Sequence, residues 1–212
     1  MASLTGFNPD VVYASINKVK AAYENLLKAL GDDMQNQFIG GMSDKWACND
    51  AQGFFNDAFK PTIDSLISSS NSTFESVVAS MNSAAQRWAH DTESSYSSVG
   101  FSPINKTMDT SVILENIAGV RGIDLVAKLP VIAESAKNAL IEARNAVTEC
   151  GFLDYASSQA QNLANSLDSI KNSIDNAVQQ ITNDSKTAIN NTLSQYGNTK
   201  GAVAEAFAGS GI

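Results

Sequence analysis

The chain has 212 residues, 43% of them hydrophobic, and a formal net charge of −8 at pH 7. This length and apolar content allow a substantial buried core, which argues against disorder of the whole chain. The acidic balance disfavours nucleic acid as a partner, because affinity for phosphates comes largely from clustered Lys and Arg. Apolar stretches are interrupted well before the roughly 20 residues that a membrane-spanning helix needs, so no integral membrane segment is expected.

The first ten residues contain neither a basic n-region nor an apolar h-region. A classical signal peptide is therefore not expected. The protein is predicted to be made in the cytoplasm, where it either stays or leaves by a route that recognises a folded surface.

Two amphipathic helices are predicted in the first half, each with one apolar face. The stripe of the first is Val12, Ile16, Val19, Tyr23, Leu26 and Leu30. The stripe of the second is Leu66, Ser70, Phe74, Val77, Met81, Ala84 and Trp88. Gly31, Gly40 and Gly41 lie between them and are predicted to end the first helix. The two helices are expected to form an antiparallel hairpin.

Trp46 is placed in or just after the bend of this hairpin, where a large aromatic ring can close the end of the seam. Asn49 and Gln52 follow with the spacing of a capping box, which would start the second helix at Asn49.

A small residue, Cys48, follows Trp46 at the second position, and Ala51 and Phe54 come next. This pattern in a hairpin bend resembles the WXG100 family of small helical-hairpin proteins, over about residues 8–95. Cys48 stands where that family has glycine. The resemblance implies export by a bacterial type VII secretion system. It also implies recognition of a helical face by another helical protein or by the secretion ATPase.

Three phenylalanines follow the bend. Phe55 and Phe59 are four residues apart, whereas Phe54 points about 100° away from Phe55 on a regular α-helix. The three cannot all face one narrow seam, so at least one is expected to contact a helix of the second half or of another chain, such as a helical partner or a second copy. The candidate partner-binding and turn residues are Trp46, Cys48, Ala51, Phe54, Phe55 and Phe59.

The second half predicts a second hairpin. Its first stripe is Leu125, Leu129, Ile132, Ala136, Leu140, Ala143 and Val147. Gly151 is expected to close that helix, and a fourth helix is expected to begin near Leu153. The fourth stripe is Ala156, Ala160, Leu163, Leu167, Ile170, Ile174, Val178, Ile181, Ser185 and Ala188. From Gly197 onward, repeated glycines predict a frayed end. Pro61 and Pro130 are each expected in a first helical turn or at a kink.

Residues 94–103 are rich in turn formers and break the helical period, and a short helix over residues 108–118 is predicted to follow. We therefore expect an all-α protein with two long antiparallel helical hairpins in tandem, residues 1–98 and 99–212, forming an elongated four-helix bundle. The halves resemble a diverged duplication. Their matching features are Cys48 before Ile63-Asp64-Ser65-Leu66, and Cys150 before Leu167-Asp168-Ser169-Ile170.

Catalytic chemistry has little support in the sequence. Two cysteines and one histidine are too few for a disulfide framework or a zinc site. Free thiols are expected at Cys48 and Cys150, with a disulfide between them as the alternative. His90 is expected to be solvated, and so is a loop pair formed by Asp32 and Asp33. We therefore expect no catalytic residue, no metal site, no cofactor and no enzymatic activity.

The leading hypothesis is a secreted, non-enzymatic substrate, partner or targeting module of a type VII system. The alternative is a structural or membrane-active bundle component, either pore-forming or part of an assembly, whose helices would insert into a bilayer. Its best insertion candidate, residues 123–146, is interrupted by six charged residues, which disfavours it. These are Asp124, Lys128, Glu134, Lys137, Glu142 and Arg144.

Overall fold

The computed structural model describes residues 7–46, 48–113, 123–151 and 153–209, and the side chains of 153–157 and 201–209 are not described. About 81% of the chain is helical, and the described residues contain no strand. The prediction of an all-α fold is confirmed.

The outgoing arm of the first hairpin is one helical rod. It consists of α1 (Pro9–Leu27), a wider π-helical segment η1 (Lys28–Ile39) and the short α2 (Gly40–Met42). The rod begins at Asn8, whose Oδ1 accepts the Asp10 N–H at 3.0 Å. Every residue of the predicted first stripe is buried.

The prediction that glycines end this helix is wrong, because the rod continues through Gly31 and Gly40. A glycine in a helix costs only about 1 kcal/mol relative to alanine. Burial of Leu30, Met34 and Phe38 in the continued rod offsets that cost. Gly31 also permits close packing, since a Cβ there would lie 2.6 Å from Cδ of Lys106.

Asp32 and Asp33 consequently lie on η1 and not in a loop. Asp32 accepts a hydrogen bond from Nζ of Lys106 at 2.6 Å, and Asp33 accepts one from Gln37 at 2.8 Å.

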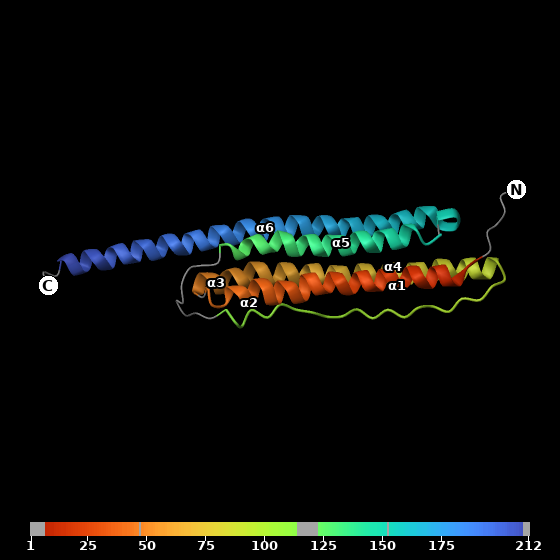
Figure 1. The fold of residues 1–212 in the computed structure, drawn as a ribbon, viewed down its shortest axis with the longest axis horizontal. Helices are drawn as coiled ribbons and strands as arrows, with labels where there is room; N and C mark the ends of the chain where they lie inside the picture. The colour runs from red at the N-terminus through yellow and green to blue at the C-terminus, as the bar shows by residue number, and fades with distance from the viewer. Residues whose placement is uncertain (1–6, 47, 114–122, 152, 210–212) are drawn as a thin grey trace.

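The returning arm runs antiparallel to the first (Figure 1). It contains α3 (Asn49–Gly53), the π-helical η2 (Phe54–Phe59) and α4 (Lys60–Asp91). Pro61 lies in the first turn of α4, as predicted. Proline lacks an N–H and its ring clashes with the carbonyl four residues earlier, which accounts for the wider turn just before it.

The second hairpin consists of a 3₁₀ turn η3 (Leu125–Ala127), α5 (Lys128–Thr148) and α6 (Leu153–Gly209). Gly151 joins the two long helices with a φ of +72°, a conformation that favours glycine. The described residues of both predicted stripes are buried or half-buried. The frayed end predicted from Gly197 onward is wrong as far as Gly209, because helix α6 continues to that residue. Residues 210–212 lie outside the described residues.

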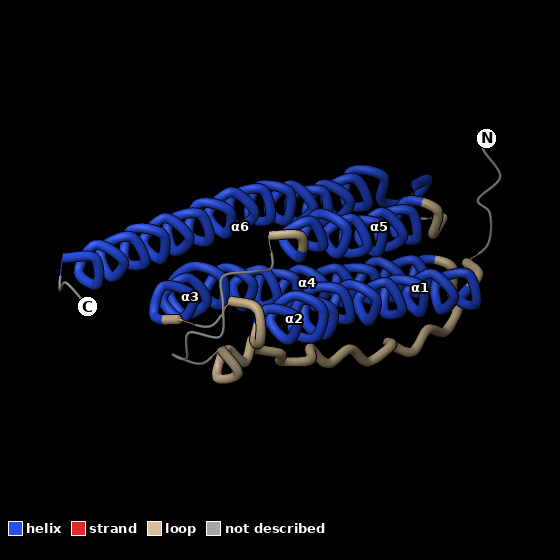
Figure 2. The backbone as a smooth tube through the Cα atoms, turned by 60° about the vertical axis from the view of Figure 1, so that its left-hand side comes forward, coloured by secondary structure: helices blue, strands red, loops and turns tan. Residues whose placement is uncertain are grey.

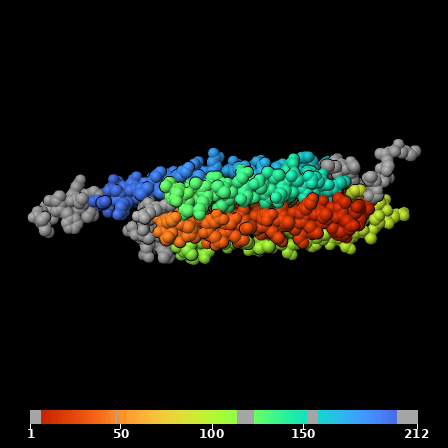
Figure 3. All heavy atoms as spheres, viewed as in Figure 1, coloured from red at the N-terminus to blue at the C-terminus, as the bar shows by residue number. Residues whose placement is uncertain are grey.

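The two hairpins pack face to face along their length (Figures 2 and 3). Helix α5 lies on α1 and η1, and α6 lies on α4. Both hairpins contribute to one hydrophobic core. At one end, α6 projects beyond the bundle (Figure 1). Leu193 and Tyr196 of α6 are exposed.

Residues 94–113, hereafter the strap, run as an extended segment along the outer side of the first hairpin, opposite α5 and α6 (Figure 2). The short helix predicted over 108–118 is absent from its described part, because residues 108–110 are extended and 111–113 form a turn. Residues 114–118 lie outside the described residues. The predicted boundary at residue 98 falls within the strap, and the division into two domains stays a prediction.

In the described part of the chain, no helix is both long enough and apolar enough to cross a membrane.

Candidate functional site

The bend of the first hairpin holds the candidate site. The chain leaves α2 at Ser43 and enters α3 at Asn49. The backbone N–H of Trp46 donates to the carbonyl of Met42 at 2.8 Å. The side chain of Trp46 is fully buried. Trp46 therefore closes the end of the hairpin seam, as the sequence predicts.

Five aromatic rings surround this point, and we call them the bend cluster. They are Phe38, Trp46, Phe54, Phe55 and Phe59. Ring centroids lie 5.5 Å apart for Trp46 and Phe54, 5.9 Å for Trp46 and Phe55, and 5.1 Å for Phe38 and Phe59. Edge-to-face and tilted pairs at these separations add to the stabilisation that comes from area burial.

All three phenylalanines after the bend belong to this cluster, although regular α-helical spacing would separate them. The wider turn of η2 is the reason, because it brings residues five apart onto one face. Phe54 and Phe59 have ring centroids 6.4 Å apart, and Phe54 and Phe55 5.1 Å. Phe54 also borders α6, so the second hairpin supplies a helix that it meets.

Helix α6 ties the bend to the second half of the chain. Nε1 of Trp46 donates to Oγ1 of Thr192 at 3.4 Å. The Thr192 hydroxyl has acceptors in Oδ2 of Asp50 at 3.2 Å and in the carbonyl of Ala188 at 3.0 Å. The indole N–H thus has a partner although it is buried.

Cys48 precedes α3 in an extended conformation, with a φ of −164°. Any residue adopts this conformation, so the glycine of the resembling family is not required here. Cys48, and not Asn49, is the N-cap residue, and its carbonyl accepts the Gln52 N–H at 3.0 Å. The predicted capping box is wrong, because Nε2 of Gln52 donates instead to the carbonyl of Ile113 in the strap at 2.9 Å. Ala51 is fully buried beneath the bend.

An open hollow of about 510 Å³ lies beside the cluster, between α3 and η2 on one side and α6 on the other. Phe54, Ala58 and Ala188 give it an apolar part. Its polar residues offer carboxylates, amides and a hydroxyl: Asn49, Asp50, Asp184, Thr187, Asn191 and Gln195. The described lining contains no Lys or Arg, so this surface suits hydrogen-bond donors and cations on a protein partner.

The remaining reactive groups lie apart from one another. Cys48 and Cys150 are both free, in the bends at opposite ends of the bundle. Burial raises the pKa of the Cys150 thiol, and a hydrogen bond with Ser15 lowers it by less. His90 is exposed beside Asp91. Among the described residues, no group of three or more His, Cys, Asp or Glu could hold a metal ion.

Sequence reasoning missed Phe38 and Thr192. Phe38 could have been found by extending the first stripe past Gly31, since Leu30, Met34 and Phe38 follow at four-residue steps. Thr192 had no signal, because its role depends on the docking of α6 against the bend.

No protein-family model, curated protein or solved structure matches the chain. The resemblance to WXG100 proteins therefore depends on the residues of the bend.

Proposed function

We propose that this protein is a non-enzymatic substrate or partner of a type VII secretion system, exported in folded form and recognised through a helical face at the bend. The observation that carries the proposal is the antiparallel helical hairpin with Trp46 buried in its bend. This hairpin with a buried Trp in its bend is the arrangement that the resemblance to WXG100 proteins implies.

Trp46 acts through the surface that it organises. Its ring is fully buried, so a partner cannot contact it without opening the bundle. The accessible neighbour is the hollow between α3, η2 and α6. A helix of the partner would contact this hollow with an apolar side chain against Phe54 and with donors toward Asp50 and Asn191.

Export into the culture medium of the encoding bacterium tests the proposal. Trp46→Ala is expected to lower export sharply, whereas Trp46→Phe, which keeps an aromatic ring, is expected to retain most of it. Trp88→Ala is the matched control, because Trp88 packs on Phe7 at the other end of the hairpin. Its export should stay near the wild-type level.

A second variant separates recognition from folding. Asn191→Trp places a bulky side chain at the hollow from an exposed position of α6, so it should leave the melting temperature unchanged and lower export. Normal export of Asn191→Trp, together with normal export of a folded Trp46→Ala protein, would contradict the proposal.

A further inference from the structure

The strap is held mainly through its backbone. Two side chains from the helices each satisfy both the N–H and the C=O of one strap residue. Asn82 accepts the N–H of Val99 and donates to its carbonyl, each at 2.9 Å. Gln35 makes the same pair of bonds with Asp109, at 2.8 and 2.9 Å.

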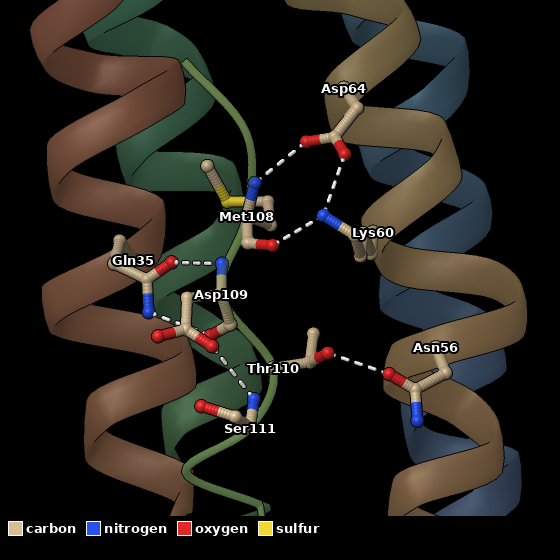
Figure 4. A network of polar contacts seen from close by, with 8 residues as sticks. All are labelled: Gln35, Asn56, Lys60, Asp64, Met108, Asp109, Thr110 and Ser111. Atoms are coloured by element: carbon tan, nitrogen blue, oxygen red, sulfur yellow. Dashed lines mark hydrogen bonds and ion pairs between the residues drawn. The ribbon is translucent and has the colours of Figure 1, made fainter.

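Between Val99 and Asp109, the side chains of Tyr23 and Asn71 each hydrogen-bond one backbone group of Ile104. The Tyr23 hydroxyl accepts its N–H at 2.6 Å, and Nδ2 of Asn71 donates to its carbonyl at 3.2 Å. Further along, Oδ1 of Asp64 accepts the N–H of Met108 at 2.7 Å, and Nζ of Lys60 donates to its carbonyl (Figure 4).

The spacing of these contacts follows from the geometry of the two elements. Asn82, Asn71 and Lys60 are separated by steps of 11 residues on α4, and 11 residues of α-helix rise about 16 Å. Five extended residues, such as those from Val99 to Ile104, span about the same length. The outer groove between α1 and α4 is therefore built to hold an extended segment in one register.

A few side chains of the strap anchor it. Met108 and Ile113 are buried, Tyr96 stacks on Tyr13 with ring centroids 5.1 Å apart, and Phe101 packs on Tyr23 at 5.0 Å. The groove thus recognises an extended backbone with apolar side chains at fixed places. The segment that meets these requirements is present in every copy of the chain.

The turn that leads from α4 into the strap is strained. The N–H of Ser94 donates to the carbonyl of Ala89 at 2.7 Å, and the N–H of Glu93 donates to that of His90 at 3.2 Å. This pattern is a Schellman motif. In this motif the residue just after the helix end, here the one before Ser94, adopts a left-handed conformation and is usually glycine. Here it is Glu93, with a φ of +53°.

We propose that the outer groove of the first hairpin binds the strap of a second copy, and that the protein forms a domain-swapped dimer by opening the turn at Glu93. In this dimer, the strap and second hairpin of each copy pack on the first hairpin of the other. The contacts of the closed monomer outside this turn are kept, and the strain of the left-handed residue is released at two turns.

Refolding of the full chain at two concentrations tests the proposal. The strap is tethered to its own groove at an effective concentration on the order of millimolar. Binding of the strap to the groove of a second copy therefore competes with binding to its own groove only in concentrated solution. The unfolded protein is diluted out of denaturant at about 10 µM, far below that effective concentration, and at about 1 mM, which is comparable to it. Size-exclusion chromatography with light scattering then measures the dimer. A dimer is expected from the concentrated sample only.

Variants of Glu93 show whether the turn controls the dimer. Glu93→Gly should lower the dimer-to-monomer ratio roughly fivefold or more, because glycine adopts the left-handed conformation without strain. Glu93→Gln is the matched control, since it removes the charge and keeps the strain, and its ratio should equal that of the wild type. Circular dichroism establishes that each monomer is folded, which is expected because Glu93 is exposed.

Three results would overturn the proposal. The first is a wild-type protein that refolds only to monomer at the higher concentration. The second is a dimer whose ratio is the same for Glu93→Gly and the wild type. The third is a Glu93→Gln ratio that falls as far as that of Glu93→Gly, because charge would then be the cause. None of these results bears on export.

Discussion

At the scale of single residues, Trp46 links three parts of the molecule. Its ring packs on Phe55 of the returning arm, whose ring in turn packs on Phe38 of the outgoing arm, and its indole N–H reaches Thr192 on α6. The same residue that suggests a secretion role therefore also has a structural role. Any measurement of function at this position requires a measurement of stability on the same variant.

Substituting Trp46→Ala is expected to lower the free energy of unfolding by about 3–5 kcal/mol, because it leaves a cavity among buried rings. Trp46→Phe should cost less, since part of the ring contact remains. Urea denaturation followed by circular dichroism measures both. A loss below about 1 kcal/mol for the alanine variant would be typical of a surface residue and would contradict the packing.

Two glycines are expected to respond in opposite directions to substitution by alanine. Gly151→Ala should destabilise by about 1 kcal/mol, because its φ of +72° is unfavourable for a residue with a Cβ. Gly53→Ala should stabilise by up to about 1 kcal/mol, since Gly53 is helical and a Cβ there meets no atom within 4 Å. Melting temperatures of the two variants should lie on opposite sides of the wild-type value, and the same sign for both would contradict these conformations.

At the scale of elements, the strap differs from the helices in what holds it. Its hydrogen bonds come from side chains that are distant in sequence, and Asn82 makes three of them. Oδ1 of Asn82 accepts from Val99 and from the Tyr96 hydroxyl, and Nδ2 donates to Val99. The amide is at the centre of the contact between α4 and the strap.

Asn82→Ala should therefore free the first part of the strap and leave the helices folded. Losing these bonds is expected to cost about 1–3 kcal/mol, because the backbone groups of Val99 lose their partners. Hydrogen exchange measured by mass spectrometry should be faster over residues 95–101 and unchanged over α5. Equal protection of residues 95–101 in both proteins would show that Asn82 does not hold the strap.

The helices could be predicted from the sequence because the apolar stripes of α1, α4, α5 and α6 repeat at helical spacing over many turns. The strap could not, since its Ser, Gly and Pro residues show no period and its extended form depends on Asn82, Asn71 and Gln35. The position of Trp46 in the bend was predictable. The wider turn of η2, which brings Phe54 into the cluster, had no signal except Pro61 after it.

At the scale of the whole molecule, the two hairpins share one core. Cys150 reports on their contact, because it lies in the bend between α5 and α6, is fully buried and hydrogen-bonds Ser15 of α1. Burial also raises the pKa of its thiol, which lowers the fraction of reactive thiolate at neutral pH. Cys48, in the other bend, is only half-buried.

Thiol labelling at neutral pH is expected to distinguish the two cysteines. In a Cys48→Ser protein, Cys150 should react far more slowly folded than unfolded. In a Cys150→Ala protein, Cys48 should react faster than Cys150 does. Equal rates for the two folded single-cysteine proteins would show that the packing of the second hairpin on α1 does not shield the Cys150 thiol.

The most direct test of the proposed function compares wild-type protein in the culture medium of the encoding bacterium with and without its type VII secretion ATPase. We expect intact protein in the medium of the parent strain and its retention in cells that lack the ATPase, with a cytoplasmic marker absent from the medium of both. Equal amounts in the two media, or complete retention in the parent strain while its type VII system exports other proteins, would contradict the proposal that this bundle is a type VII substrate or partner.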